Sequence, residues 1–276
     1  MATTFVTSSD GVRLAVHESG DPDGPVLVAV HGFPDNHHVW DGVAAELADF
    51  RFVAYDVRGA GESDKPTGRA AYRIERLADD LAAVLDAVSP DGPVHLLGHD
   101  WGSMQLWQPL ADPRFAGRVA TFTSISGPSP DYVGAWFRDR RHVGSSVRQV
   151  LASTYMALFQ VPRVPEAVLR RAPVERVAGR SFRRTPADKT NGINIYRANI
   201  PARVLRPRPA RVEIPVLVLA PVDDPYSRLA TATEAPLPYV DDLTVETIEG
   251  GHWVVAEDPR LVAERVRAFV SPALTR

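Results

Sequence analysis

The segment Gly98–Gly102 places an aspartate, Asp100, at the centre of a predicted turn between two glycines. The apolar run before it predicts a buried strand, and the residues from Ser103 to Leu110 predict the start of a helix. The two glycines allow a sharp strand-to-helix turn that raises its central side chain above the edge of the sheet. A serine there would attack acyl groups. A carboxylate is a poor acyl acceptor, but it displaces a leaving group at a saturated carbon and forms an alkyl-enzyme ester. Asp100 is therefore the candidate nucleophile.

Two strand ends further along the chain carry an acid and a base. The run Ile214–Leu219 predicts a buried strand followed by Asp223 and Asp224, and residues 243–248 alternate like a strand that is followed by His252. A parallel sheet binds its ligands at the carboxyl ends of its strands, so these loops face the same crevice as Asp100. Of the eight histidines, His252 has the context that best suits a general base.

Backbone donors for a developing oxyanion are expected at two further positions. The apolar run Val26–Val30 leads into the loop His31–Pro34, in which the backbone N–H of Phe33 would be one donor. The N–H of Trp101, directly after the nucleophile, would be the other. We expect four positions beside these groups to contact the substrate: His31, Pro34, Trp101 and Trp253. A nucleophile, an acid, a histidine and an oxyanion loop in this order favour catalysis over a purely structural interpretation.

These motifs resemble those of the epoxide hydrolase branch of the α/β-hydrolase fold. The similarity extends from about Phe5 to the last predicted helix, and the chain is especially similar to the hydrolase half of proteins that join such a domain to a short-chain dehydrogenase. No dehydrogenase half lies within these 276 residues, so that activity is not carried over. The matching segments are His31–Pro34, Asp56–Ser63, Gly98–Gly102 and Gly251-His252.

The resemblance also implies two tyrosines that protonate the epoxide oxygen, one before a Phe-Gln pair and one in an Asn-x-Tyr-Arg segment. Tyr155 precedes Phe159-Gln160, and Tyr196 lies in Asn194–Arg197. A lone tyrosine in an amphipathic helix is more often a packing residue. Two tyrosines, both in matching contexts, favour the role of proton donors.

The acid of the triad is left open by the residues themselves, because Asp223 and Asp224 are adjacent. The family pattern Gly-x-x-Asp-Pro, with Pro221 in place of the glycine, implies Asp224. A position after the predicted strand Val119–Ile125 is the alternative.

Three other functions remain alternatives to epoxide hydrolysis. A haloalkane dehalogenase uses the same Asp/His/Asp machinery and generally holds the departing halide with two N–H donors; Trp101 would supply one, but Phe33 has no side-chain donor for the second. Fluoroacetate-cleaving relatives place an arginine after the nucleophile, where this chain has Trp101. The other two alternatives are a relative that binds a ligand without turnover and a ring-forming enzyme that uses an internal nucleophile.

Alternating strands and helices predict an α/β fold with a doubly wound, mostly parallel sheet, and the resemblance implies eight strands. We expect the two N-terminal strands of the set to pair antiparallel at one edge. Strands are expected near residues 12–17, 26–30, 51–55, 94–97, 119–125, 215–220 and 243–248, and helices near 74–88, 101–111 and 256–270.

The stretch 128–212 interrupts this alternation between two predicted strands. A structureless loop of that length would be implausible in a compact domain, and Val143–Leu158 has the periodicity of an amphipathic helix. We therefore expect a helical lid over residues 128–212, inserted into a hydrolase core made of residues 1–127 and 213–276.

Composition describes an ordinary globular protein with a net charge of −3 and 45% hydrophobic residues. No apolar run approaches the roughly 18 residues of a membrane span, and the N-terminus lacks the pattern of a signal peptide, so we expect a cytoplasmic protein. The absence of cysteine excludes disulfides and thiol chemistry. We expect no cofactor.

His37 and His38 have no neighbouring carboxylate or cysteine to complete a ligand set, so we expect a solvated loop there and no metal.

Charge is distributed unevenly along the chain. Residues 128–215 contain 17 arginines and lysines against six acids, a balance of +11, whereas the rest of the chain has a balance of −14. Solvated helices explain this adequately. The alternative is a lid that meets an acidic partner or an anionic membrane surface.

The expected substrate is a small apolar epoxide. Nucleic acid is not expected, because no binding module is recognisable. The sequence does not indicate an oligomeric state.

Overall fold

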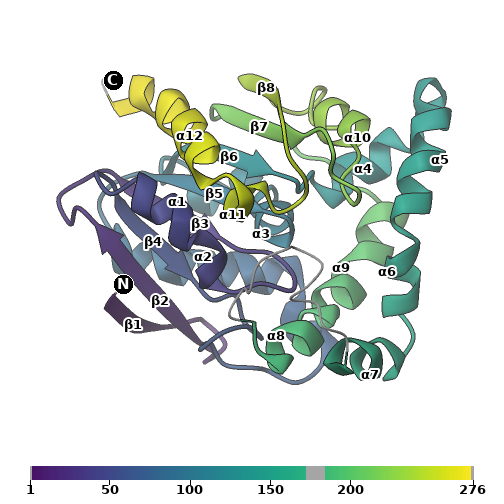
Figure 1. The fold of residues 1–276 in the computed structure, drawn as a ribbon, viewed down its shortest axis with the longest axis horizontal. Coiled ribbons are helices and arrows are strands. Elements are labelled where there is room, and N and C mark those ends of the chain that lie inside the picture. The colour runs from purple at the N-terminus through teal and green to yellow at the C-terminus, as the bar shows by residue number, and fades with distance from the viewer. Residues whose placement is uncertain (1, 172–183, 275–276) are drawn as a thin grey trace.

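An eight-stranded sheet forms the centre of the molecule, with strand order β1-β2-β4-β3-β5-β6-β7-β8. The structure is a computed structural model that describes residues 2–171 and 184–274 (Figure 1). The mostly parallel, eight-stranded fold predicted from the sequence is confirmed. The strands are β1 (Ala2–Thr7), β2 (Arg13–Gly20), β3 (Val26–Val30), β4 (Arg51–Tyr55), β5 (Val94–His99), β6 (Val119–Ile125), β7 (Val216–Pro221) and β8 (Leu243–Ile248).

The antiparallel edge differs from the prediction. Strand β2 is antiparallel to both of its neighbours, β1 and β4, whereas β3 lies between β4 and β5 and is parallel to both. The predicted antiparallel pairing of 12–17 with 26–30 is therefore wrong, and the edge partner is β1, which the sequence did not predict. Five of the six β1 residues are exposed, so this edge strand has little of the apolar alternation that identifies strands. Strand order also depends on how the chain crosses over, which no local pattern records.

Helices cover both faces of the sheet, as a doubly wound fold requires. Side chains of β3 alternate between two cores: Val28 and Val30 pack toward α2, and Leu27 and Ala29 pack toward the opposite face. The first face carries α2 (Ile74–Val88) and α3 (Trp101–Leu106), and the second carries α1 (Asp41–Glu46), α11 (Val254–Glu257) and α12 (Pro259–Leu274).

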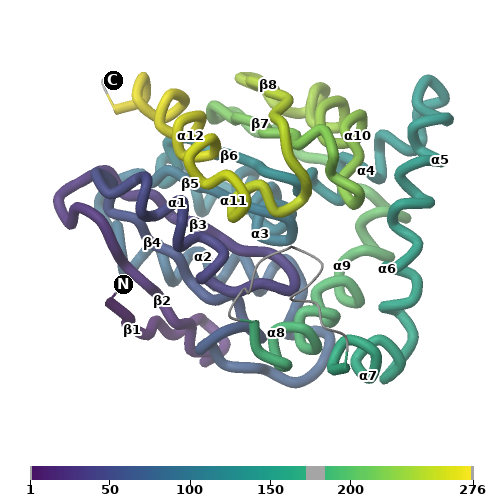
Figure 2. Tube along the Cα trace, in the orientation of Figure 1, coloured from purple at the N-terminus to yellow at the C-terminus, as the bar shows by residue number. Residues whose placement is uncertain are grey.

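The segment between β6 and β7 is helical within the described residues, as predicted. Figures 1 and 2 show these teal and green helices along one side of the molecule, beside the sheet. The predicted helix Val143–Leu158 is divided at Ser153 into two helices. That this segment forms a separate lid domain with the bounds 128–212 remains a prediction. Its helices are α4 (Pro130–Trp136), α5 (Val143–Ala152), α6 (Thr154–Phe159), α7 (Val164–Arg171), α8 (Pro186–Asn191) and α9 (Ile193–Leu205); α10 (Leu229–Glu234) follows β7.

Short 3-10 turns complete the connections: His37–Trp40, Arg69–Tyr72, Pro109–Ala111, Pro113–Phe115 and Arg140–His142. Within residues 2–171 and 184–274, no helix has both the length and the apolar character needed to cross a bilayer.

Candidate active site

The turn at Asp100 has the strained geometry that the sequence predicts. Asp100 joins the end of β5 to the start of α3 with φ 51° and ψ −124°, a backbone conformation that residues other than glycine rarely adopt. Both neighbouring glycines are sterically required. A Cβ on Gly98 would lie 2.6 Å from the Cα of Ser103, and a Cβ on Gly102 would collide with the carbonyl oxygen of Val30. The turn thus holds the Asp100 carboxylate in one fixed place.

His252 lies between two carboxylates. Its Nδ1 is 2.9 Å from Oδ2 of Asp224, and its Nε2 is 3.5 Å from Oδ2 of Asp100. The other oxygen of Asp224 accepts the backbone N–H groups of Tyr226 and Ser227, at 2.8 and 2.9 Å. Asp224 is buried, whereas the neighbouring Asp223 is exposed. The structure therefore brings Asp224, and not Asp223, onto the histidine.

The two oxygens of Asp100 have different surroundings. Oδ1 accepts the backbone N–H of Phe33 at 2.7 Å, while Oδ2 faces His252. Gly32 permits this approach, because a Cβ there would collide with the Asp100 carboxylate and lie 2.7 Å from the backbone nitrogen of Trp101. Trp101 is the first residue of α3, and backbone N–H groups in a first helical turn have no acceptor within the helix. The backbone nitrogens of both predicted oxyanion donors thus lie close to the Asp100 carboxylate, beside Gly32.

The two predicted tyrosines come together from separate helices. Tyr155 on α6 and Tyr196 on α9 pack edge to face, with their ring centroids 6.1 Å apart. Burial raises the pKa of Tyr155 far above its usual value, and the charge of Asp100 raises it further. Burial, Tyr155 and Asp100 likewise raise the pKa of Tyr196. Both hydroxyls therefore stay protonated at neutral pH. Tyr155 lines the cavity described below, whereas Tyr196 is not among its described lining residues, so the role of the pair as proton donors remains a prediction.

The charge state of His252 depends on both carboxylates. Burial opposes its protonation, but the negative charges and hydrogen bonds of Asp224 and Asp100 outweigh burial and raise the pKa of His252 to about 10. For Asp224, burial alone would raise the pKa, but His252 and the N–H of Ser227 hold it below its usual value. At neutral pH the free protein therefore holds His252 as an imidazolium between two carboxylates.

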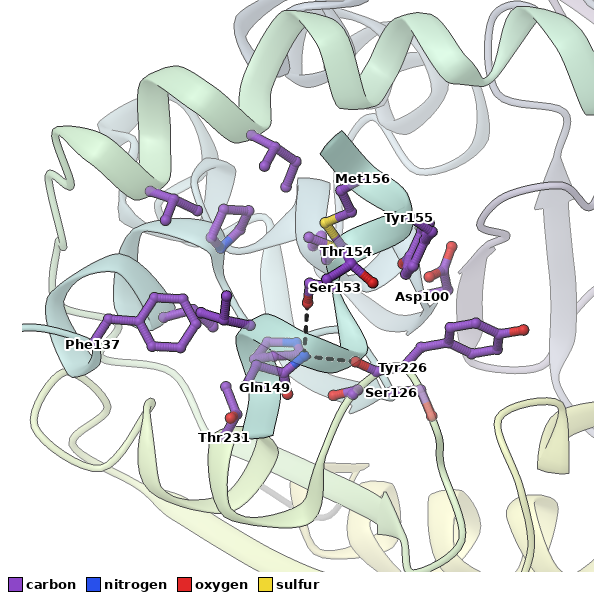
Figure 3. A pocket seen from close by; sticks show the side chains of 18 of the residues that line it. Asp100, Ser126, Phe137, Gln149, Ser153, Thr154, Tyr155, Met156, Tyr226 and Thr231 are labelled. Carbon is purple, nitrogen blue, oxygen red and sulfur yellow. Dashed lines mark hydrogen bonds between the residues drawn. The ribbon is translucent and has the colours of Figure 1, made fainter. Parts of the chain in front are cut away.

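A cavity of about 310 Å³ opens in front of these groups and is lined by Asp100, His252 and Tyr155. Figure 3 shows Tyr155 and Asp100 next to each other at one end of it. Its size suits a small organic molecule. Apolar side chains form most of the remaining wall: Met104, Pro128, Pro130, Val133, Phe137, Val150, Met156, Ala157, Ile200 and Val204.

The residues expected to contact the substrate lie elsewhere. Within the part of the chain that the structure describes, the lining of this cavity does not include His31, Pro34, Trp101 or Trp253. Both ring nitrogens of His31 are used inside the loops, Nδ1 with the carbonyl of Gly32 and Nε2 with the N–H of Val57, each at 2.9 Å. These bonds brace the oxyanion loop, and the contact of His31 with the substrate remains a prediction. Trp253 packs against His252, and its Nε1 donates to the buried carboxylate of Asp35.

Two cavity residues were missed by the sequence analysis. Tyr226 packs its ring edge to face against His252, with centroids 5.0 Å apart, and its position two residues after Asp224 was the signal that could have identified it. Gln149 on α5 is buried, and its amide nitrogen donates to the hydroxyl of Ser153 and the carbonyl of Tyr226. Nothing in the local sequence distinguishes Gln149 from an ordinary helix residue.

The expectation of a solvated loop at His37 is wrong. His37 is buried, and its ring stacks on that of His17 with centroids 3.4 Å apart. Asp56 accepts from both rings, at 2.8 Å from His37 and 3.3 Å from His17, and also from the backbone N–H groups of His37 and Glu62. The three side chains are close enough to be metal ligands. The rings are nearly parallel, however, so their nitrogen lone pairs do not converge on one point. We interpret the cluster as a hydrogen-bonded brace.

Comparison with known protein families identifies an α/β hydrolase fold over residues 25–259. A Mycobacterium tuberculosis protein named "Probable oxidoreductase EphD" is 38% identical over 98% of this chain and 49% of its own length. The chain thus spans about half the length of that relative. "Epoxide hydrolase A" of the same organism is 39% identical over 46% of this chain and 39% of its own length.

Solved structures of epoxide hydrolases are also similar to this chain. A structure described as novel epoxide hydrolases from metagenomes of hot environments has a TM-score of 0.77 and 25% identity, with 98% of each chain covered. The epoxide hydrolase of Bacillus megaterium has a TM-score of 0.79 over 97% of this chain and 100% of its own. At 24% identity, this likeness shows only that the two chains share a fold. The chain is a member of the α/β-hydrolase family, with named epoxide hydrolases among its relatives in both sequence and structure.

Proposed function

We propose that this protein hydrolyses a small apolar epoxide to a vicinal diol through a covalent ester on Asp100. The observation that carries the proposal is the asymmetry of the Asp100 carboxylate. Oδ1 is held by the N–H of Phe33 and Oδ2 faces His252, at the end of an apolar cavity that also contains the hydroxyl-bearing Tyr155. The names of the relatives support the same reaction class.

In the first step, one Asp100 oxygen attacks the less hindered epoxide carbon, and the bond between that carbon and the ring oxygen breaks. The electron pair of that bond passes to the oxygen, which takes a proton from Tyr155 or Tyr196. Donors aimed at a developing oxyanion stabilise the transition state. Tyrosine hydroxyls are protonated at neutral pH, and the raised pKa values of these two keep them so at higher pH as well. The product of the step is a hydroxyalkyl ester of Asp100.

In the second step, His252 activates a water molecule. Esterification removes the negative charge of Asp100, which is one of the causes of the high His252 pKa, so His252 loses its proton more readily in the intermediate than in the free protein. That proton restores the tyrosine hydroxyl that gave up its own in the first step, and the neutral imidazole then takes a proton from the water. The activated water attacks the ester carbonyl carbon. The N–H groups of Phe33 and Trp101 stabilise the oxyanion. The ester C–O bond then breaks, and the departing oxygen takes the proton of the new carboxyl group, so the diol leaves, Asp100 is again a carboxylate and His252 is again protonated. Asp224 keeps the imidazole oriented throughout, and side chains and water suffice for every step.

Dehalogenation of a haloalkane remains the second candidate, because the same triad would displace a halide. The pair Tyr155 and Tyr196 favours the epoxide, since an opened epoxide needs a proton and a departing halide does not. Binding without turnover and ring formation by an internal nucleophile use the same cavity and would give no diol.

Incubation with a panel of small epoxides and haloalkanes, scored for diol and for halide, tests the reaction class. We expect diol from the epoxides and little halide. The variant His252→Gln should accumulate a covalent adduct on Asp100, visible by mass spectrometry, and Asp100→Asn should show none. Halide without diol would favour the dehalogenase, and a bound ligand without an adduct would favour a binding protein.

A single turnover in water enriched in heavy oxygen tests the covalent step. With enzyme in excess, the first diol should be largely unlabelled, because its new oxygen comes from the Asp100 carboxylate, and the label should enter Asp100. Immediate labelling of the diol would mean that Asp100 acts only as a general base.

The helical segment between β6 and β7 also carries an excess of positive charge. We propose that the positively charged segment between β6 and β7 meets an acidic partner or an anionic membrane surface, on the basis of its balance of +11 in sequence.

A further inference from the structure

The helices α5 and α6 carry a row of exposed aliphatic side chains. Val143, Val147, Val150 and Leu151 follow one another at spacings of four, three and one residues, which places them on one face of α5. Their exposed fractions lie between 53% and 64%, and Leu158 on α6 is 46% exposed. Side chains of this kind normally lie in the core, and contiguous exposed apolar surface commonly marks an interaction site.

Arginines accompany this row. Arg140 and Arg141 precede α5, and Arg148 lies on it beside the aliphatic face; all three are exposed. Within residues 139–171 the acids are Asp139 and Glu166, and each lies in an ion pair with an arginine. Three more exposed arginines follow along the same segment: Arg163, Arg170 and Arg171. The segment is therefore both apolar and positively charged.

The same helices form a wall of the candidate active site. Val150, Thr154 and Ala157 are exposed to solvent and also line the cavity that contains Asp100. The cavity therefore reaches the surface beside the aliphatic row. A ligand bound along α5 and α6 would have a short path to Asp100.

We propose that this apolar–basic face, made of Val143, Val147, Leu151, Leu158 and Arg148, docks on the surface of an anionic lipid bilayer. Aliphatic side chains inserted among the lipid head groups and arginines held near anionic phosphates are the two contributions that bind amphipathic helices to such surfaces. A second copy of the chain presenting the same face would bring like charges together, which disfavours a symmetric dimer here. Docking would let an apolar epoxide pass from the bilayer into the cavity. This last step rests on the proposed function, whereas docking itself does not.

Flotation of the purified protein with lipid vesicles tests the docking. We expect co-flotation with vesicles containing phosphatidylglycerol, little with pure phosphatidylcholine, and a decrease as salt is raised. Val147→Glu and Leu151→Glu should each reduce the bound fraction at least tenfold. Leu274→Glu is the matched control: Leu274 is 45% exposed on α12, which lies on the opposite side of the molecule in Figure 1, and binding should persist. Circular dichroism and thermal melting establish that each variant is folded.

Turnover separates this proposal from the proposed function. All three variants should hydrolyse a water-soluble epoxide at the unmodified rate, whereas hydrolysis of an epoxide dissolved in anionic vesicles should fall only for Val147→Glu and Leu151→Glu. Flotation without any epoxide turnover would overturn the proposed function and leave docking intact. No flotation of the unmodified protein, equal flotation of all variants, or a dimer that Leu151→Glu dissociates would overturn the docking proposal.

Discussion

The side-chain amide of Gln149 on α5 donates to the carbonyl oxygen of Tyr226 at a distance of 2.7 Å; a dashed line marks this bond in Figure 3. Its oxygen accepts the backbone N–H of Arg228 at 2.9 Å. One buried side chain thus joins a helix of the segment between β6 and β7 to the loop that begins at Asp224. The N–H groups of Tyr226 and Ser227 on that loop bind Asp224, so Gln149 helps to position the carboxylate beside His252.

Replacing Gln149 by leucine should therefore impair turnover as well as stability. Unpaired backbone groups of Tyr226 and Arg228 cost about 1–3 kcal/mol in stability, and a displaced acid loop should lower kcat by about 10- to 100-fold. Ser153→Ala is the control, because it removes one partner of Gln149 and leaves both bonds to the loop. Thermal melting and steady-state kinetics measure the two effects. A lower melting temperature with unchanged kcat would show that Gln149 is only structural.

Neutralising each of the two adjacent aspartates should have very different effects on activity. Asp224→Asn removes the carboxylate that orients His252 and should reduce kcat by about 10³- to 10⁴-fold, as the loss of the orienting acid does in other triads. Asp223→Asn changes an exposed side chain and should leave most activity. Initial-rate measurements on both variants decide between them. The reverse ranking would transfer the acid role to Asp223.

Removing the tyrosine hydroxyls tests their role as proton donors. Tyr155→Phe and Tyr196→Phe change little volume, so each should lower kcat by about 10- to 1000-fold with a smaller effect on folding. Rates and melting temperatures of the single and double variants measure this. Tyr132→Phe is a suitable control, because its buried hydroxyl donates to the carbonyl of Ala210, outside the reacting groups. Near-normal epoxide turnover in the double variant would remove the main reason for preferring an epoxide to a haloalkane.

The stability of the protein should depend on pH through His252. Its pKa is raised from 6.5 to about 10 in the folded state, by Asp224 and Asp100 against the opposing effect of burial. A group with a raised folded pKa contributes stability fully below its unfolded pKa, and that contribution is lost as the pH rises through the folded pKa. The stability difference between the unmodified protein and His252→Gln should therefore shrink between about pH 6.5 and about pH 10.

Urea unfolding of both proteins across this range measures the difference. Asp100→Asn removes one of the two charges that raise the His252 pKa, so nuclear magnetic resonance should show His252 titrating at a lower pH in that variant. An unchanged titration would mean that Asp100 has little influence on the histidine.

The sequence by itself determined those features that neighbouring residues specify. The turn at Asp100 could be predicted because glycines on both sides are sterically required there, and the helix at 74–88 because its apolar face repeats within a few residues. Alternating apolar strands and helices likewise indicated the doubly wound sheet and the helical character of the segment between β6 and β7. In each case the physical cause acts over a few residues.

Tertiary structure decided everything that joins distant parts of the chain. Only packing showed that Asp224 faces His252, that β1 forms the antiparallel edge, and that His17 and Asp56 enclose His37. The bond from Gln149 to Tyr226 joins residues 77 positions apart. Such contacts depend on strand order and on the angles at which helices pack against the sheet. These follow from burial of the whole apolar surface, and no single segment of the sequence records them.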